Sequence, residues 1–371
     1  MPQITKIVIT GGPCAGKTTA LSKVEKHFTG LGYRVIFANE AATELILNGI
    51  VPWLGKGADF QNTLIRTQRN KEQLAMEWAI RLGHDKVLLV CDRGALDNKA
   101  YMSDKEFALV LSELQVSEIE LRDHYDAVFH LVTAANGAEE FYTTANNEAR
   151  TETIPEAIAL DNKLIAAWTG HPHLRVINNE VEFEVKMQRL VSEIASFIGE
   201  PEPYEIERKF LIKYPDLTML EQLAHCTKVE IIQTYLHSSD PGEEIRVRQR
   251  GRDGEYIFTE TIKKRVSPLK RVETERRLTQ KEYLALLMNA DTTLRQIRKT
   301  RYCLSFSDQY MEIDIYPFWK EQAILEVEMS DEGGEVVFPE FIQVLREVSG
   351  DEAYENRSLA ESVPDEPASS T

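Results

Sequence analysis

The segment 205–209 has the alternation of a β-strand but carries charge where a strand normally carries apolar side chains. Its sequence is Glu-Ile-Glu-Arg-Lys, so Glu205, Glu207 and Lys209 point to one face of the strand. Period-2 alternation normally places apolar side chains on the protected face. Burial of three ionisable groups is costly unless they pair with one another, with a metal ion or with a charged ligand. The segment therefore predicts a binding site on the face of a sheet.

The same arrangement recurs along the second half of the chain. Closely spaced strands are expected near residues 204–212, 229–236, 244–250, 255–263, 271–278, 299–306, 310–316 and 324–329. Charged residues share a face on these strands as well: Arg246, Arg248 and Arg250; Arg271, Glu273 and Glu275; Lys299 and Arg301; Glu312 and Asp314; Glu326 and Glu328; with Lys263 ending another strand. The opposite faces are apolar and predict packing against helices near 217–225, 279–289 and 338–348. We expect a predominantly antiparallel β domain, closed or nearly closed around a charged interior.

Such an interior suits a hydrated polyanion together with metal ions. The basic side chains are candidates to bind phosphate oxygens: Lys209, Arg246, Arg248, Lys263, Arg271, Lys299 and Arg301. The acidic side chains are candidates to hold one or two divalent cations that polarise a phosphoryl group and activate water: Glu205, Glu207, Glu273, Glu275, Glu312, Asp314, Glu326 and Glu328. The alternative is an open sheet with a solvated ladder of cross-strand ion pairs.

A phosphate-binding loop lies about 190 residues upstream of this strand. The run Gly11-Gly12-Pro13-Cys14-Ala15-Gly16-Lys17-Thr18 fits GxxxxGK[ST], follows an apolar strand from Ile4 to Thr10 and precedes a helix that begins at Lys17. Backbone N–H groups of such a loop bind a β-phosphate at the helix N-terminus, and the lysine neutralises β- and γ-oxygens. The Thr18 hydroxyl completes a Mg²⁺ shell. Nucleotide-binding candidates are Gly11, Gly12, Pro13, Cys14, Ala15, Gly16, Lys17, Thr18 and Thr19.

Three further residues are candidates for the chemistry at this loop. Asp92 ends the apolar strand 87–91, the position from which a Walker-B acid holds Mg²⁺ directly or through water; a helix-capping loop Asp is the alternative. Glu40 follows the second strand, where small-molecule kinases of this class place a carboxylate near the phosphoryl acceptor; a solvated Glu is the alternative. Arg150 is a candidate lid arginine for the γ-phosphate, and a solvated loop Arg is as plausible a reading.

The pattern of elements divides the chain into two domains and a tail. Residues 1–199 alternate short apolar runs with longer helical ones, which predicts an α/β P-loop NTPase or kinase-like domain with a parallel sheet and helices on both faces. Residues 200–362, after a Gly/Pro/Glu stretch, form the predicted β domain with its helices. Residues 363–371 offer little apolar surface, and we expect a disordered tail.

Composition narrows the classes of partner. The chain of 371 residues has 43 Lys and Arg against 60 Asp and Glu, a net charge of -17, which argues against nucleic acid as a partner. No apolar run approaches the roughly 18 residues that span a bilayer, and the four cysteines lack metal-site spacing. We expect a soluble, cytoplasmic protein with reduced thiols; its oligomeric state stays open.

The charged strand motifs resemble the CYTH domain, the triphosphate tunnel metalloenzyme fold. The matching motifs are Glu205-x-Glu207-x-Lys209, Arg246-x-Arg248, Thr261-x-Lys263, Arg271-x-Glu273-x-Glu275, Lys299-x-Arg301, Glu312-x-Asp314 and Glu326-x-Glu328. The resemblance spans about 204–360 and implies an eight-stranded antiparallel tunnel, α+β in class. It further implies a triphosphate or other organophosphate ligand, with Mg²⁺ or Mn²⁺ as cofactor, and in some members phosphoanhydride hydrolysis.

The first domain resembles the AAA-type P-loop domain of NadR-type nicotinamide-riboside kinases. The resemblance rests on Glu40, on Asp92-Arg93-Gly94 and on the stretches 149–152 and 168–172. The two domains together resemble the eukaryotic family of TRP-channel translocation-defect proteins. That resemblance implies a GTP-binding, phosphoinositide-binding regulator of membrane-protein trafficking, peripheral at endomembranes.

Three functions follow as hypotheses. The first is a Mg²⁺-dependent nucleotide-binding or hydrolysing protein, using GTP or ATP, whose tunnel binds and hydrolyses a triphosphate or other organophosphate. The second is a GTP-dependent regulator whose tunnel only holds a ligand such as a phosphoinositide headgroup; the basic segment 263–271 is compatible with such contact, or is two strand ends joined by a solvated turn. The third is a small-molecule kinase.

Overall fold

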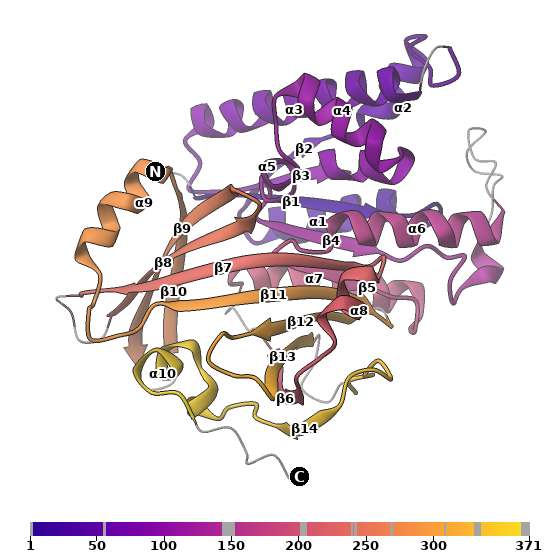
Figure 1. The fold of residues 1–371 in the computed structure, drawn as a ribbon. Coiled ribbons are helices and arrows are strands. Elements are labelled where there is room, and N and C mark those ends of the chain that lie inside the picture. The colour runs from indigo at the N-terminus through magenta and orange to yellow at the C-terminus, as the bar shows by residue number, and fades with distance from the viewer. Residues whose placement is uncertain are drawn as a thin grey trace. The chain divides into compact units, whose positions relative to one another are not determined.

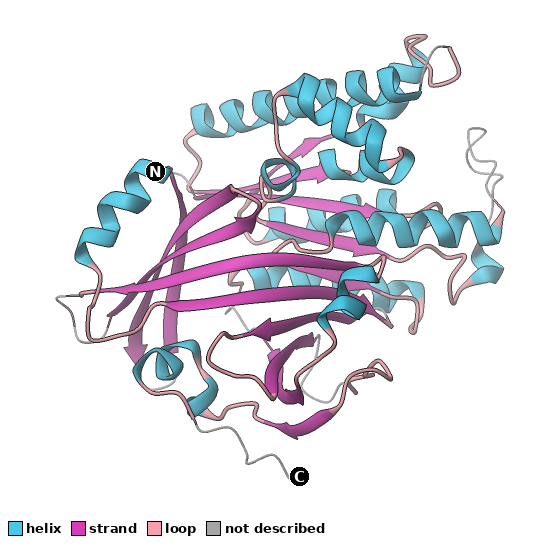
Figure 2. Ribbon diagram, in the orientation of Figure 1, coloured by secondary structure: helices cyan, strands magenta, loops and turns pink. Residues whose placement is uncertain are grey.

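The computed structural model describes residues 3–54, 57–142, 153–200, 206–238, 240, 243–267, 270–307, 309–329 and 335–364. The side chains at 141, 206, 264–267 and 270–274 lie outside this description. The chain divides into two compact units, one up to Glu205 and one from Ile206 onward. Figures 1 and 2 show the elements of each unit. No helix in the described part of the chain combines the length and the apolar character that a bilayer crossing requires.

The first unit is built on a parallel sheet of five strands in the order β2-β3-β1-β4-β5. Its strands are β1 (Gln3–Gly11), β2 (Arg34–Ala38), β3 (Lys86–Asp92), β4 (Ala127–Leu131) and β5 (Leu174–Ile177). The central strands β1, β3 and β4 read as continuous apolar runs because both faces of the sheet are covered. This arrangement confirms the predicted α/β domain.

Helices cover both faces of this sheet (Figure 2). The elements are α1 (Lys17–Gly30), α2 (Ala41–Leu47), α3 (Gly57–Leu82), η1 (Ala95–Tyr101), α4 (Asp104–Leu114), α5 (Glu118–Arg122), η2 (Glu139–Phe141), α6 (Ile154–Trp168) and α7 (Phe183–Ile198), with η marking short 3₁₀ helices. The apolar stripes of α1 and α7 pack on one face, where Phe28, Phe129 and Leu190 are fully buried. The helices α3 and α6 contact the sheet through β2, β3 and β1.

The second unit is one antiparallel sheet of nine strands in the order β10-β9-β8-β7-β11-β12-β13-β6-β14. The strands are β6 (Ile206–Lys213), β7 (Cys226–Leu236), β8 (Glu243–Arg252), β9 (Glu255–Ser267), β10 (Lys270–Leu278), β11 (Ile297–Phe306), β12 (Gln309–Ile315), β13 (Gln322–Met329) and β14 (Val344–Glu347). Its helical segments are α8 (Leu217–Gln222), α9 (Gln280–Leu286), η3 (Leu287–Asn289), η4 (Glu352–Tyr354) and α10 (Asn356–Glu361). All eight predicted strands are present, and the ninth, β14, was not predicted.

The predicted helix at 338–348 is wrong, because its second half is strand β14. The outer edge of β6 leaves backbone donors and acceptors that a strand satisfies and a helix does not. Lys213 N donates to Gln343 O at 2.9 Å, and Val348 N donates to Lys209 O at 2.7 Å. The apolar residues Val344 and Val348 pack in two different clusters.

The two faces of the nine-stranded sheet differ as predicted. One face carries the apolar side chains of β6 and β11–β13, with Tyr302, Met311 and Leu325 buried beside Leu220 of α8. The other face carries the charged residues over most of its length. One end of this charged face is covered by an aromatic cluster that includes Tyr316, Trp319 and Tyr354.

The segment predicted as a disordered tail begins with two described residues. Val363 packs against the aromatic cluster, and Trp319 Nε1 donates to the carbonyl of Pro364 at 3.2 Å. The rest of that segment lies outside the described residues.

Candidate phosphate-binding sites

The loop between β1 and α1 has the backbone conformation that only glycine adopts easily. Gly16 has φ +91°, in the left-handed region, and immediately precedes Lys17, the first residue of α1. A Cβ on Gly11 would lie 2.2 Å from the carbonyl oxygen of Leu131 on the neighbouring strand β4. The N–H groups in the first turn of α1 lack acceptors within the helix. The compact glycine-rich loop lets an anion approach them closely.

This loop borders a cavity of about 960 Å³ at the carboxyl ends of the parallel strands. Open α/β sheets bind ligands at this edge. The cavity collects Pro13 to Thr19 of the loop with Glu40, Asp92 and Arg93, and extends to Tyr101 and to residues that follow β4 and β5: Ala134, Gly137, Ala138, Glu140, Leu160, Asn179, Glu180, Val181, Glu182, Phe183 and Lys186. The structure thus places Lys17, Thr18, Thr19, Glu40 and Asp92 in one cavity.

Lys17 is a cation of this cavity whose side chain lies close to the loop backbone. Its Nζ lies 3.5 Å from the carbonyl oxygen of Gly11. Burial and the positive charge of Arg93 lower the pKa of Lys17 to about 8, although Asp92 and Glu40 oppose the shift. An incoming phosphate group would supply the negative charge that the ammonium group lacks in the ligand-free cavity.

Asp92 follows β3 and leaves one oxygen without a partner. Its Oδ1 is buried and has no hydrogen-bond partner among the described residues. Burial raises the pKa of Asp92, and the Lys17 charge opposes that rise. A buried carboxylate oxygen that lacks a donor fits a divalent cation, and Thr18 supplies a hydroxyl in the same cavity.

Glu40 and Arg93 form an ion pair at the edge of this cavity. Arg93 Nε donates to Glu40 Oε1 at 2.9 Å, and Thr43 Oγ1 donates to Glu40 Oε2 at 3.0 Å. Burial raises the pKa of Glu40, but the charges of Arg93 and Lys17 and these hydrogen bonds outweigh burial and lower it. Glu40 is therefore ionised and held in place.

The second site lies on the charged face of the antiparallel sheet, where one arginine connects three carboxylates. Arg301 on β11 donates from Nε to Asp314 Oδ1 at 2.6 Å and from Nη2 to Glu326 Oε2 at 2.6 Å, and its Nη1 pairs with Glu312. Lys299 lies two residues before Arg301 on β11, and its Nζ donates to Asp314 Oδ2. These acids come from β12 and β13, so the network ties three neighbouring strands together.

Lys209 on β6 extends the network toward the predicted metal acids. Its Nζ lies 3.0 Å from Glu326 Oε1 and 3.3 Å from Glu207 Oε1. Partial burial and the Glu326 charge raise the pKa of Glu207 to about 7, despite the Lys209 charge. The register of β6 and β13 sets Glu207 directly opposite Glu328, which brings two acids together across the strands.

A basic group lies on β8 and β9 of the same face. Arg246 and Arg248 face Tyr235 and Gln233 in the register with β7, and Arg250 is buried nearby. Arg248 Nε is buried without a hydrogen-bond partner among the described residues. Burial and the charge of Arg246 lower the pKa of Arg248 to about 10. Lys263, on β9, lies opposite Glu244 in the register with β8.

Family models match both halves of the chain. The model of an AAA domain matches residues 6–186, and the model of a CYTH domain matches residues 203–353. The chain joins an AAA domain to a CYTH domain. The architecture predicted from the motifs is therefore confirmed.

Solved structures match parts of the chain. An inorganic triphosphatase is 28% identical, with 44% of this chain and 97% of that chain covered and a TM-score of 0.32. A thymidylate kinase from Ehrlichia chaffeensis is 16% identical, with 53% of this chain and all of that chain covered (100%) and a TM-score of 0.37. No curated protein matches the sequence. At these TM-scores, the function of the chain has to be argued from its own residues.

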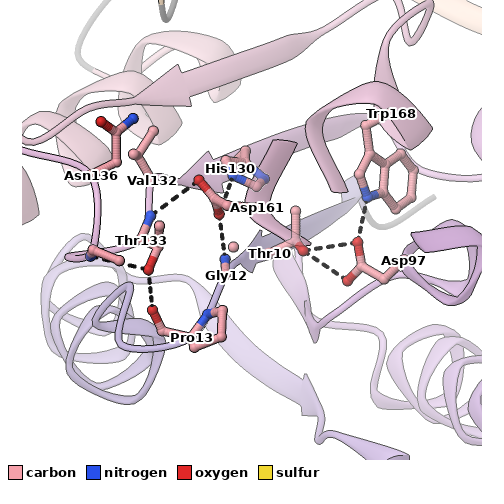
Figure 3. Close-up of polar contacts among 12 residues, drawn as sticks. Thr10, Gly12, Pro13, Asp97, His130, Val132, Thr133, Asn136, Asp161 and Trp168 are labelled. Carbon is pink, nitrogen blue, oxygen red and sulfur yellow. Dashed lines mark hydrogen bonds and ion pairs between the residues drawn. The ribbon is translucent and has the colours of Figure 1, made fainter. Parts of the chain in front are cut away.

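Two buried aspartates that bond the end of β1 or the loop after it were not revealed by the motifs (Figure 3). Asp161 of α6 accepts hydrogen bonds from Gly12 N at 2.7 Å and Thr133 N at 3.2 Å, and His130 Nε2 lies 3.0 Å from its Oδ1. Asp97 of η1 accepts from Thr10 Oγ1 at 2.8 Å and from Trp168 Nε1 at 2.5 Å.

A signal for Asp161 was present in the sequence. It occupies the apolar stripe of α6, between Ala157 and Leu164 at helical spacing, and an aspartate in such a stripe requires partners. Asp97 carried no comparable signal, because η1 is short and irregular.

Several predicted site residues lie outside the described part of the chain. These are Arg150 and Glu205, together with the side chains of Arg271 and Glu273. In the CYTH domain, Glu275 accepts from Thr261 Oγ1 at 3.0 Å, away from the Arg301 network. Among the described residues, no group of three or more Asp, Glu, His and Cys side chains is arranged to hold a metal ion.

Proposed function

We propose that the AAA domain binds a nucleoside triphosphate with Mg²⁺, and that the CYTH domain binds and hydrolyses a second, linear polyphosphate. The observation that carries the proposal is the incompletely paired guanidinium group of Arg248 beside Arg246, on the face that also holds the Glu207 and Glu326 carboxylates. A buried guanidinium nitrogen without an acceptor is costly, and a phosphate oxygen would supply the missing acceptor.

Two acids that face each other on the charged face of the CYTH domain support the proposal of a divalent cation. Like charges placed directly opposite across two strands are destabilising, and Glu207 faces Glu328 in this way. Glu207 and Glu328 would hold a Mg²⁺ or Mn²⁺ ion, whose charge would offset the repulsion and polarise a phosphoryl group. Water would then attack the terminal phosphorus while the P–O–P bond breaks, so that tripolyphosphate yields pyrophosphate and orthophosphate.

The AAA cavity supports the nucleotide part of the proposal. Lys17 and the N-terminus of α1 would face phosphate oxygens, and Thr18 and Asp92 would hold Mg²⁺. The cavity continues to Asn179–Phe183, which leaves room for a nucleoside. The lining residues favour neither adenine nor guanine, so ATP and GTP are equally suitable probes of the cavity.

Orthophosphate release from tripolyphosphate, with Mg²⁺ or Mn²⁺, tests the tunnel in a Lys17→Met background that silences the AAA site. We expect Arg248→Met and Glu207→Gln to lower the rate at least about tenfold, since the first removes a charge that would bind the phosphate and the second a carboxylate that would hold the cation. Arg208→Met is the matched control, because Arg208 pairs with Glu347 outside the Arg301 network. Equal rates in wild type, Arg248→Met and Glu207→Gln would refute tunnel hydrolysis.

The same variants separate hydrolysis from ligand holding. If tripolyphosphate or a soluble inositol phosphate binds wild type and not Arg248→Met, while no orthophosphate appears, the tunnel is a binding site alone. Binding of phosphoinositide vesicles that depends on both Arg248 and nucleotide would then support a regulator recruited to membranes.

A small-molecule kinase is a second candidate for the AAA domain. The Glu40–Arg93 pair and Tyr101 line the nucleotide cavity, in positions where an acceptor hydroxyl could meet a carboxylate. Turnover of ATP or GTP that rises with an added nucleoside, and that Glu40→Gln abolishes, would support phosphoryl transfer. Turnover that ignores every added hydroxyl compound would exclude it for those compounds.

A further inference from the structure

Helix α6 places a fully enclosed carboxylate directly behind the phosphate-binding loop. Asp161 has 2% of its surface exposed and accepts hydrogen bonds from the backbone N–H groups of Gly12 and Thr133. Its third partner is His130 of β4, which is completely buried. Figure 3 shows the carboxylate between the loop on one side and the end of β4 on the other.

The same carboxylate explains why residue 12 is glycine. The GxxxxGK[ST] pattern fixes residues 11 and 16 as glycine but leaves position 12 free. A Cβ on Gly12 would lie 2.5 Å from Asp161 Oδ1, so any other side chain would displace the carboxylate or the loop. The backbone of the loop at Gly12 and the Asp161 side chain of α6 are therefore packed against each other.

A negative charge at this position disfavours anion binding, so its presence requires another explanation. A carboxylate near a phosphate site repels the ligand, and the repulsion is stronger away from bulk water. Burial raises the pKa of Asp161, but its interaction with His130 and the hydrogen bonds from Thr133 and Gly12 lower the pKa by more, so the carboxylate stays ionised. Bonds to a charged acceptor are about twice as strong as neutral ones, which suits a carboxylate that must hold backbone N–H groups in place.

We propose that Asp161 is a positioning residue for the nucleotide: through Gly12 it holds the phosphate-binding loop in its binding conformation before the ligand arrives. The inference rests on the proposed binding of a nucleoside triphosphate in the AAA cavity. Asp161 also bonds Thr133, whose hydroxyl pairs with the carbonyl of Pro13, so α6 and the segment that follows β4 hold the loop at two adjacent residues. A loop fixed in advance loses less conformational entropy on binding, which raises affinity.

Calorimetry with Mg²⁺ and the imidotriphosphate analogues of ATP and GTP tests this in the full chain. Binding that Lys17→Met weakens by at least about tenfold is assigned to the AAA cavity. We expect Asp161→Asn to weaken that binding roughly tenfold, because one acceptor oxygen becomes an NH₂ group, and Asp161→Ala to weaken it further, toward a hundredfold. Hydrogen exchange of the ligand-free protein is expected to quicken at Gly12 to Ala15 in both variants.

Leu164→Ala is the control for simple loss of stability. Leu164 is fully buried in the same helix and does not line the cavity. We expect it to lower the melting temperature at least as much as Asp161→Asn does, while its nucleotide affinity stays within about twofold of wild type. Equal losses of affinity in Leu164→Ala and Asp161→Asn would overturn the positioning role, because α6 would then act through stability alone.

Two other outcomes also overturn the inference. Tighter nucleotide binding by Asp161→Asn would mean that charge repulsion outweighs positioning. Unchanged affinity and unchanged loop exchange would mean that Gly12 needs no support from Asp161. If wild type shows no binding that depends on Lys17, the proposed nucleotide function fails, and loop exchange in Asp161→Asn then still reports on whether the carboxylate fixes the loop.

Discussion

The proposed phosphate sites in the AAA cavity and the CYTH tunnel both contain cations, but the two sites hold those cations by different means. In the cavity, a glycine-rich backbone and one helix N-terminus form most of the site, and Asp92 keeps one oxygen without a described partner. In the tunnel, the charged groups are side chains on several strands. The single guanidinium group of Arg301 bonds Glu312, Asp314 and Glu326.

This difference predicts different consequences when a charge is removed. Each charge of the Arg301 network is a partner of another charge inside the sheet, so its loss leaves an uncompensated buried group. In the AAA cavity, Lys17 and Asp92 form no ion pair among the described residues, so we expect them to act chiefly on a ligand. Removing a tunnel charge should therefore affect folding, whereas removing a cavity charge should affect binding.

The largest effect is expected for Arg301→Met. The variant leaves Glu312, Asp314 and Glu326 without their shared guanidinium group, and Asp314 is completely buried. Loss of one partner of a buried ion pair costs about 3–5 kcal/mol. Urea unfolding followed by a probe in the CYTH domain measures the change. Asp314→Asn in the Arg301→Met background should recover part of it, and a loss below about 1 kcal/mol would contradict the comparison.

Lys17→Met should affect binding and leave folding intact. The Lys17 pKa, lowered to about 8 by burial and by Arg93, shows that the ammonium group is not well compensated in the ligand-free cavity. Its replacement should not lower the melting temperature. A charge-assisted hydrogen bond contributes about 1.5–3 kcal/mol, so nucleotide affinity should fall roughly tenfold to a hundredfold. Melting curves with and without nucleotide test both points, and an unaltered nucleotide-induced shift would refute the role of Lys17.

The sequence predicted those parts of the fold that depend on neighbouring residues. The loop before Lys17 and the alternation of Arg246 and Arg248 are local patterns, and each specifies its own element. The strand β14 was missed because its pairing partner, β6, lies well over a hundred residues away in sequence and supplies the edge that makes a strand favourable. Local propensity could not reveal that edge.

The same reason explains the aspartates that were missed at the AAA site. Asp161 is 149 residues from Gly12, and Asp97 is 87 residues from Thr10, so neither bond leaves a pattern of spacing. The tunnel acids were recognisable by their shared face, but the sequence did not say which cation each would meet. That pairing depends on strand register, for example of Arg301 with Asp314.

The pH dependence of the tunnel sharpens the comparison further. Partial burial and the Glu326 charge raise the Glu207 pKa from 4.5 to about 7, so the folded state retains a proton that the unfolded state releases. This group stabilises the fold fully below about pH 4.5, and its contribution is lost as pH rises through 7. Glu207→Gln should therefore unfold less readily than wild type at pH 8, with the difference shrinking toward pH 5.

Urea titrations of both proteins at several pH values test this prediction. Glu275→Gln is the control, because Glu275 is exposed and bonds only Thr261 among the contacts described for it. A constant difference between wild type and Glu207→Gln from pH 5 to 8 would show that Glu207 titrates normally. With divalent cations at pH 8, we expect wild type to be more stable than Glu207→Gln, since the ionised Glu207 would then coordinate a cation.

The smallest effect is expected for an ion pair of the CYTH domain outside the Arg301 network. Arg208 and Glu347 are joined by two hydrogen bonds, of 2.9 and 2.7 Å, and their side chains are 29% and 42% exposed. Solvent screens such a pair, so Arg208→Met should cost at most about 1 kcal/mol even though its geometry is as good as that of Arg301. A double-mutant cycle with Glu347→Gln isolates the pairwise energy, and 0.5 M salt should reduce it. If Arg208→Met destabilised the domain as strongly as Arg301→Met, burial would not be what separates the tunnel from the surface. The contrast between a tunnel that folds through its charges and a cavity that binds through them would then have to rest on the AAA site alone.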